Sequence, residues 1–176
     1  MRILKWLLGI IAALVVLLIA IALMLPNDFT VTRSIVINAP ADKIYPLVAA
    51  PAEWKKWSVW NQRDPAMQMT FSGPASGTGA AWDWQSKSQG NGGMKFTAAT
   101  PNQNIDYELH FEGMGKPSSG ALKFEPQAGG TKLTWSMHGN SEGNLMMKLF
   151  SPFMDKMVGS DFDSGLKNLK KLVEQP

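Results

Sequence analysis

The stretch that decides the fold reads NIDYELHF from Asn104 to Phe111 and alternates apolar with polar side chains. Successive side chains of a β-strand point to opposite faces, so this alternation predicts a strand with one apolar and one polar face. The apolar face carries Ile105, Tyr107, Leu109 and Phe111, and the polar face carries Asp106, Glu108 and His110. Such a strand needs a partner layer to cover its apolar side.

Runs with the same two-residue period recur along most of the chain after residue 66, separated by turns that contain Gly or Pro. They predict six consecutive strands, and the β-branched run from Phe29 to Ile37 predicts one more before them. The expected strands span residues 29–37, 67–71, 79–86, 93–99, 104–112, 119–126 and 131–139. Strands that follow one another through short turns are typical of an antiparallel sheet.

Helices are predicted between the first two strands and at the C-terminal end. Pro40 begins a short helix that Pro46 limits or bends, and a second short helix after Pro51 carries Trp54 and Trp57. The last helix is expected to begin with Ser151 as its cap and to continue almost to the end of the chain. Its apolar residues recur at helical spacing: Phe153, Met157, Phe162, Leu166, Leu169 and Val173.

Gly159 and Gly165 lie inside this last helix, where each glycine costs about 1 kcal/mol relative to alanine. Close approach of the helix to the sheet explains them, and a local break at Gly159 is the alternative. Because the final helix is the only long amphipathic element, it is the expected cover for the apolar sheet face. The predicted fold class is therefore α+β, a curved antiparallel sheet wrapped around a long C-terminal helix.

The N-terminal leader is apolar from Ile3 to Leu25 except for Lys5, and about 20 such residues are enough to cross a bilayer as a helix. Arg2 and Lys5 are expected to stay on the cytoplasmic side. This arrangement predicts an anchor over residues 1–26, in the inner (cytoplasmic) membrane, and a periplasmic domain over residues 27–176. A cleaved signal peptide is the alternative, because Ala20-Ile21-Ala22 fits a small-x-small cleavage pattern.

Composition excludes several classes of chemistry. The 176 residues include no cysteine, so neither thiolate catalysis nor a Cys-ligated metal is possible, and no metal site or cofactor is expected. The net charge is +3, but part of it lies in the leader and no basic face is apparent, so nucleic acid is not an expected partner. The Gly-rich run from Gly73 to Gly79 precedes a strand, whereas a phosphate cradle needs a helix N-terminus.

The expected interior is almost wholly apolar. Both histidines, His110 and His138, fall on polar strand faces, and Arg33 is the one charged residue that shares a face with apolar neighbours. A charge in that position needs a partner, a ligand or an opening to water. Six tryptophans and nine methionines follow the leader, and such rings and thioethers suit an adaptable apolar cavity as well as a filled core.

Several segments resemble the START-like SRPBCC superfamily, in its polyketide cyclase/dehydrase-like branch. The matching segments are residues 37–44 (INAPADKI), 54–60 (WKKWSVW), 77–82 (GTGAAW), 130–135 (GTKLTW), 159–162 (GSDF) and 165–170 (GLKNLK). The resemblance spans about Phe29 to Glu174. It implies the helix-grip fold, in which the sheet and the C-terminal helix enclose a hydrophobic cavity, and a superfamily that includes lipid carriers and aromatic cyclases.

Three functions are consistent with these observations. The first is non-catalytic binding of a lipid or an apolar small molecule at the membrane surface; the second is a cyclase-like enzyme with Tyr107 and Arg33 as first candidates; the third is an interaction module with a filled core. No catalytic residue is assigned. The expected ligand-binding residues are Arg33, Trp54, Trp57, Trp60, Trp82, Trp84, Phe96, Tyr107, Leu109, Phe111, Trp135, Met137 and Met157.

Overall fold

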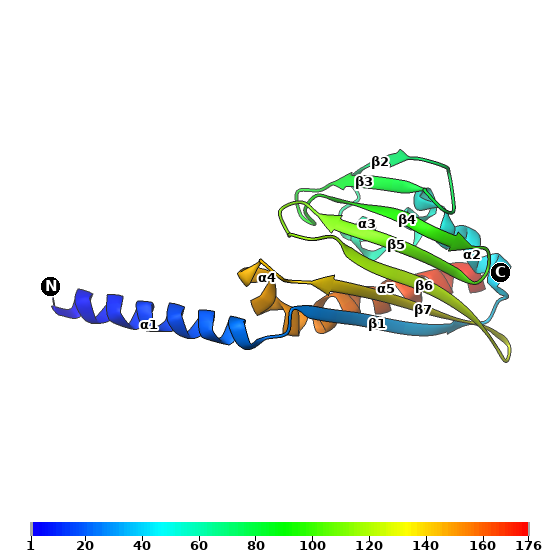
Figure 1. Ribbon diagram of the computed structural model, residues 1–176. Helices are drawn as coiled ribbons and strands as arrows, with labels where there is room; N and C mark the ends of the chain where they lie inside the picture. The colour runs from blue at the N-terminus through cyan, green and yellow to red at the C-terminus, as the bar shows by residue number, and fades with distance from the viewer. Residues whose placement is uncertain (1, 176) are drawn as a thin grey trace.

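The computed structural model describes residues 2–175, and its central element is one seven-stranded antiparallel sheet (Figure 1). The strand order is β1-β7-β6-β5-β4-β3-β2, so the first strand pairs with the last and the others form a meander. The strands are β1 Asp28–Ile37, β2 Gln68–Ser72, β3 Ala81–Gln85, β4 Gly92–Thr100, β5 Asn104–Phe111, β6 Ser118–Gln127 and β7 Gly130–Asn140. All seven predicted strands are confirmed.

The sheet curves around one long helix, α5 (Met154–Glu174), which crosses its inner face (Figure 1). The register of β4 on β5 shifts between Phe96 and Ala98, and an irregularity of this kind bends a strand and increases its twist. Strands β1 and β7 pair from Asp28–Asn140 to Ile37–Thr131 and lie beneath α5. The predicted α+β fold, a curved sheet around a C-terminal helix, is confirmed.

Helix α5 is continuous through both of its glycines, which removes the alternative of a break at Gly159. A Cβ at Gly159 would collide with the guanidinium of Arg33, and a Cβ at Gly165 would lie 3.4 Å from the Trp135 ring. Both glycines are buried, Gly159 against Arg33 and Gly165 against Trp135. The helix therefore approaches the sheet closely, as the close-approach interpretation predicted.

Shorter helices connect these elements: α2 Ala41–Ala49, η1 Pro51–Lys56, α3 Val59–Arg63, α4 Leu145–Phe150 and η2 Ser151–Phe153. Pro40 occupies the N-cap of α2, and Pro46 lies inside that helix without ending it. The sequence did not predict α3 or α4. The prediction that Ser151 caps the last helix is wrong, because its hydroxyl donates to the carbonyl of Lys148, while Asn144 caps α4 instead.

The alternation of side chains predicted for the strands is confirmed by burial. The inner face of β5 buries Ile105, Tyr107 and Leu109, and the inner face of β7 buries Leu133, Trp135 and Met137. His110 and His138 are both exposed on the outer face. The inner face of the sheet is consequently apolar over its whole length, with Arg33 as the charged exception.

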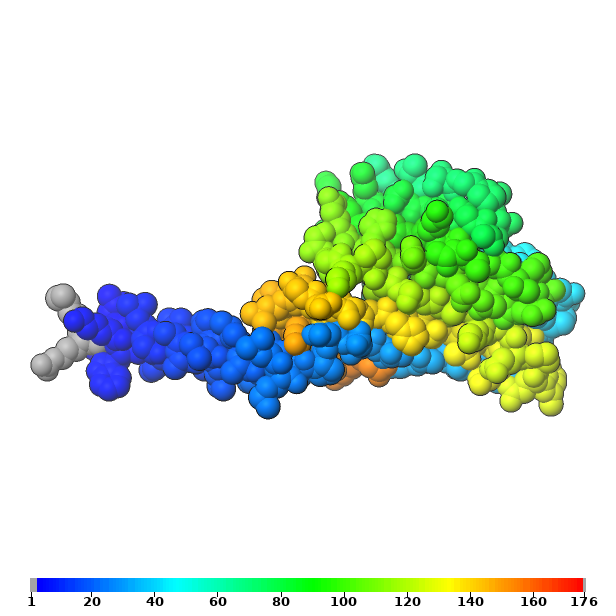
Figure 2. All heavy atoms as spheres, viewed as in Figure 1, coloured from blue at the N-terminus to red at the C-terminus, as the bar shows by residue number. Residues whose placement is uncertain are grey.

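The N-terminal helix α1 (Arg2–Met24) projects from the domain as an uncovered rod (Figure 2). Residues Ile3–Met24 form a helix long and apolar enough to cross a membrane. Ala22, near its C-terminal end, is the one residue of this span that is buried, and α1 contacts α4 there. Both the backbone amide and the hydroxyl of Ser141 donate to the carbonyl of Asn27, at 2.8 Å each, and join the leader to the end of β7.

Candidate functional site

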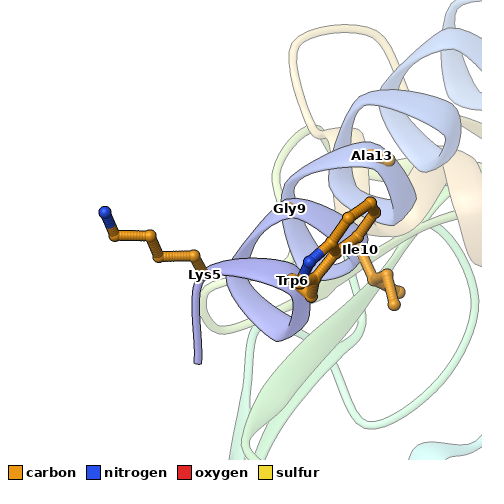
Figure 3. A pocket seen from close by; sticks show the side chains of 5 residues that line it. All are labelled: Lys5, Trp6, Gly9, Ile10 and Ala13. Carbon is orange, nitrogen blue, oxygen red and sulfur yellow. The ribbon is translucent and has the colours of Figure 1, made fainter. Parts of the chain in front are cut away.

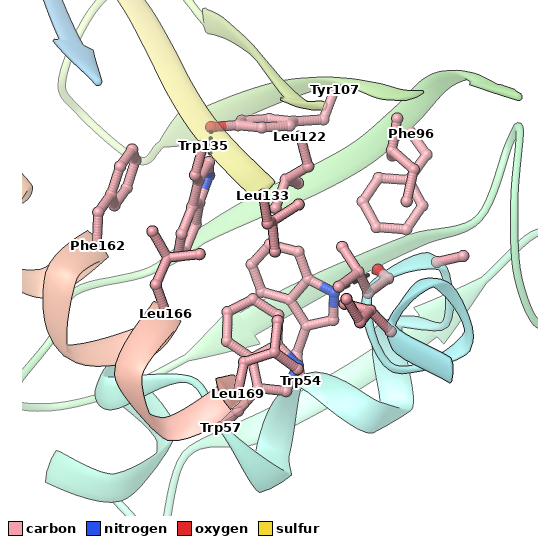
Figure 4. Close-up of a cluster of buried hydrophobic side chains, with 14 of the residues drawn as sticks. Trp54, Trp57, Phe96, Tyr107, Leu122, Leu133, Trp135, Phe162, Leu166 and Leu169 are labelled. Carbon is pink, nitrogen blue, oxygen red and sulfur yellow. Dashed lines mark hydrogen bonds between the residues drawn. The ribbon is translucent and has the colours of Figure 1, made fainter. Parts of the chain in front are cut away.

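The space between the inner sheet face and α5 contains a group of packed aromatic rings, here called the tryptophan cluster (Figure 4). Its members are Trp54, Trp57, Trp82, Phe96, Trp135 and Phe162. Trp54 lies at the centre, with ring centroids 4.4 Å from Trp57, 5.2 Å from Trp82 and 5.4 Å from Trp135. On the helix side, Trp135 and Phe162 stack in parallel at 3.9 Å.

Three indole nitrogens of the tryptophan cluster, those of Trp54, Trp57 and Trp135, are hydrogen-bonded within the protein. The indole nitrogen of Trp54 donates to the carbonyl of Val48 at 2.8 Å, and that of Trp57 donates to the carbonyl of Leu47 at 3.0 Å. These bonds join η1 to the end of α2 and direct both rings inward. A hydrogen bond within the protein offsets the cost of removing a buried donor from water, so the cluster is held both by packing and by these hydrogen bonds.

The rings of the tryptophan cluster occupy space between the sheet and α5 where the sequence predicts a cavity. Within residues 2–175, the two best-formed hollows both lie outside the sheet. One, of about 350 Å³, follows α1 beside Trp6, Gly9 and Ile10 (Figure 3). The other, of about 450 Å³, lies near the C-terminus beside Lys167, Lys171 and Gln175. The sequence correctly predicts which side chains of the strands face inward, but not how closely they pack.

A row of apolar residues crosses four strands at the end of the sheet that faces α1, and is called the mouth row below. It consists of Met69 (β2), Trp84 (β3), Gly92 (β4) and Phe111 (β5), which are direct cross-strand neighbours. Trp84 and Phe111 meet edge to face across Gly92 with centroids 5.6 Å apart. Unlike the tryptophan cluster, the three side chains of this row are only partly buried.

Glycines on the inner face leave room for aromatic rings against the backbone in this part of the sheet. A Cβ at Gly92 would collide with the ring of Trp84, one at Gly120 with the ring of Tyr107, and one at Gly139 with the ring of Phe29. These glycines were not among the expected site residues, although their positions on the apolar faces of β4, β6 and β7 could have indicated them. Each ring therefore lies against backbone rather than interdigitating with a facing side chain.

Tyr107 places a buried phenol next to the tryptophan cluster. Its hydroxyl donates to the carbonyl of Ser136 and accepts from the indole nitrogen of Trp135, each at 2.9 Å (Figure 4). Burial raises the pKa of Tyr107 far above its ordinary value. The hydroxyl thus stays protonated and already uses its proton, so its geometry suits a structural hydrogen bond better than proton transfer.

Arg33 joins β1 to α5 at the edge of the interior. It forms ion pairs with Asp155 at 2.7 Å and Asp163 at 3.1 Å, and it donates to the backbone carbonyl of Asp155. The hydrogen bond that Arg33 donates to the Asp155 carboxylate raises the pKa of Arg33, and the same contact lowers the pKa of Asp155. Since Gly159 leaves room for the guanidinium, the charge predicted on the apolar face is neutralised by carboxylates of the covering helix.

The thirteen residues expected at the site fall into three groups. Buried in the interior are Trp54, Trp57, Trp82, Phe96, Tyr107, Leu109, Trp135 and Met137; partly buried are Trp60, Trp84 and Phe111; and Arg33 and Met157 lie outside it. Met157 is 56% exposed on the outer side of α5, because the helix turns Gly159 and Phe162 inward instead. Phe162, which is buried in the interior, and Met69, which is partly buried in the mouth row, were not among the thirteen.

Comparison with protein families identifies the chain. A family described as polyketide cyclase / dehydrase and lipid transport matches residues 28–174. The chain belongs to this family. The match covers the whole sheet and α5, and the family name describes ligand-binding proteins, which agrees with the resemblance noted in the sequence.

Solved structures of the same fold support this assignment. Protein CV1439 from Chromobacterium violaceum shares 17% identity at a TM-score of 0.63, covering 84% of this chain and 98% of its own. The di-domain ARO/CYC StfQ from the steffimycin biosynthetic pathway shares 13% identity at a TM-score of 0.63, covering 84% and 51%. The Aha1 dimer from Colwellia psychrerythraea shares 20% identity at a TM-score of 0.60, covering 82% and 96%. No curated protein matches the chain. At these identities, the structures show the polyketide cyclase-like fold alone.

Proposed function

We propose that this domain binds a lipid or an apolar small molecule, without catalysis, between the sheet and α5 at the surface of a membrane that α1 spans. The observation that carries the proposal is the mouth row. Met69, Trp84 and Phe111 form an apolar, partly exposed edge at the end of the inner face nearest α1. An apolar edge that leads into an apolar interior favours apolar ligands.

The interior supports binding rather than chemistry. Its polar groups bond to one another, as the contacts of Tyr107 with Trp135 and Ser136 show. Arg33 is neutralised by Asp155 and Asp163. Within residues 2–175, no group of three or more His, Asp or Glu side chains is placed to hold a metal ion. The mechanism that fits these contacts is binding through apolar contact area.

A ligand has to displace side chains, because the interior is filled. The rings most easily moved are those of the mouth row, where Trp84 lies against Gly92 and contacts Phe111 and the side chains are only partly buried. Rotating these rings outward exchanges ring–backbone contacts for ring–ligand contacts, so little apolar surface is newly exposed to water. The tryptophan cluster would remain in place as the closed end of the site.

The membrane sets where the domain lies and provides lipids as the class of ligand. The span Ile3–Met24 is long enough for a bilayer, and Arg2 and Lys5 favour a cytoplasmic N-terminus, with residues 27–176 on the periplasmic face of the inner membrane. Tethering keeps the mouth row within a short distance of the lipid surface and raises its effective concentration there.

Native mass spectrometry of the fragment 27–176, secreted to the periplasm and then incubated with membrane lipid extract, tests the proposal. A stoichiometric bound apolar molecule is the expected result. Phe111→Ala should change its occupancy, whereas Val36→Ala, on the outer face of β1, should not. An empty fragment that also refuses added lipid would contradict the proposal.

One observation favours a second candidate, an interaction module with a filled core. The rings of the tryptophan cluster pack closely against one another in the interior, and a permanently closed interior needs no ligand for stability. The fragment that stays empty in the presence of lipid would support this candidate. The two functions differ in whether the rings of the mouth row rotate outward and admit a ligand.

A further inference from the structure

Most of the large apolar side chains that are exposed on the domain lie in one region. Between residues 25 and 175, eight large apolar residues are exposed, and five of them lie between positions 145 and 157. Together with Met114 they are called the α4 patch, which consists of Met114, Leu145, Met146, Phe150, Phe153 and Met157. An exposed cluster of large apolar side chains on a small domain marks an interaction surface.

The α4 patch has helical order. Met146 and Phe150 lie four residues apart within α4, which places both side chains on one face of that helix. Phe153 and Met157 follow in η2 and at the start of α5. Helix α4 buries none of its six residues, so its apolar side is not part of the domain core.

The patch lies at the point where the domain meets α1. Helix α4 contacts the C-terminal end of α1 and is the helix of the domain that lies beside it in Figure 1. Ser141, three residues before the α4 cap Asn144, is bonded to Asn27 directly after the apolar span. A bilayer crossed by Ile3–Met24 therefore has its surface next to α4.

A turn beside the mouth row adds to the same surface. Lys116 forms an ion pair with Glu142 at 2.7 Å, which joins the β5–β6 turn to the segment before α4. Met114 of that turn is 51% exposed and follows Phe111, the last residue of the mouth row, by three positions. The patch and the mouth row thus lie at the same end of the domain.

We infer that the α4 patch lies in the headgroup region of the bilayer beside α1, as a second membrane contact that turns the mouth row toward the acyl chains. Lys148 and Lys156 lie in the same segment and suit anionic lipid headgroups. An interfacial helical face of large apolar residues with nearby lysines is the pattern expected at a membrane surface. This inference rests on the proposed membrane anchor.

Single-cysteine spin labelling of the full chain tests this inference, since the chain has no cysteine of its own. Four variants are reconstituted in nanodiscs that contain anionic phospholipid: Phe150→Cys and Met146→Cys in the patch, Leu14→Cys within α1, and Ala128→Cys in the β6–β7 turn at the opposite end of the domain. Collision of each nitroxide with lipid-soluble oxygen is compared with collision with a water-soluble nickel chelate.

The expected result is an oxygen-to-nickel ratio several-fold higher for the two patch labels than for the Ala128→Cys label, and highest for Leu14→Cys. If the Leu14→Cys label lies in lipid while both patch labels give the same ratio as the Ala128→Cys label, the inferred membrane contact of the α4 patch is wrong and the α1 anchor is retained. If Leu14→Cys is also exposed to water, the anchor and the contact both fail. Patch labels shielded from both reagents, with dipolar broadening, would show a second copy on the patch and overturn the inference.

Discussion

The tryptophan cluster and the mouth row are both aromatic, but they are held in different ways. Trp54, Trp57 and Trp135 are surrounded by other rings, are almost wholly buried and have hydrogen-bonded indole nitrogens. Trp84 and Phe111 touch each other over a glycine and remain partly exposed. Aromatic content alone therefore does not distinguish a structural core from a candidate binding edge, whereas burial and ring contacts do.

The largest expected effect is on the stability contributed by the tryptophan cluster. Trp135→Ala removes the stack on Phe162 and the indole donor to Tyr107, and is expected to lower the free energy of unfolding by about 3–5 kcal/mol. Urea denaturation of the fragment 27–176 measures this change. Trp84→Ala in the mouth row is the matched control, and an equal loss in both variants would remove the contrast between the two regions.

The next effect concerns how closely α5 lies on β1. Gly159→Ala places a methyl group against the Arg33 guanidinium, which must then move away from Asp155 and Asp163, and after the gain in helix propensity it is expected to lower the free energy of unfolding by about 1 kcal/mol. Gly165→Ala is the matched control, because its methyl group meets Trp135 and Trp57 at ordinary contact distances of 3.4–3.6 Å. That variant is expected to be neutral or to gain up to about 1 kcal/mol from helix propensity.

A double-mutant cycle shows whether the Gly159 effect acts through Arg33. Truncating the guanidinium in Arg33→Ala removes the atoms that the new methyl group would meet. The double variant Arg33→Ala/Gly159→Ala should therefore lose less stability than the sum of the two single losses. Additive losses would show that the helix tolerates the methyl group by shifting as a whole.

A smaller change in stability is expected in the mouth row, together with a larger change in ligand exchange. Phe111→Ala removes a half-buried ring and is expected to cost about 1 kcal/mol, roughly half the value of full burial. Uptake of a fluorescent fatty acid by the fragment, followed in stopped flow, should become faster because the edge over Gly92 is open. Unchanged uptake, as expected for Val36→Ala, would indicate that ligands reach the interior elsewhere.

The smallest expected effect is on acid stability. The hydrogen bond from Arg33 holds the pKa of Asp155 below its ordinary value of about 3.9, so this pair stabilises the fold above that pH. Its contribution is lost as the pH falls through the lowered pKa of the folded state. Thermal melts between about pH 5 and pH 2 should therefore show a smaller decline for Asp155→Asn than for the natural chain. A parallel decline would show that the pair adds nothing to stability.

Local periodicity explains why so much of the sheet was predictable. Alternation in segments such as 104–111 and 131–138 assigns each side chain to a face without knowledge of its partners, and burial confirms those assignments. Helices α3 and α4 were missed because they have five and six residues, too few to establish a helical period. The cap at Ser151 was wrong because Asn144 begins an additional helix that ends there.

The amino-acid sequence by itself determined the antiparallel sheet, the covering C-terminal helix, the apolar leader and the outward position of both histidines, because each depends on local pattern. Only the tertiary structure decided that the inward rings pack against one another in the interior and that Arg33 pairs with Asp155 and Asp163. It also decided that Trp84 lies against Gly92 at the end of the sheet near α1. These features depend on the distances between elements far apart in the chain. Packing geometry sets those distances, and no repeat in the sequence encodes them.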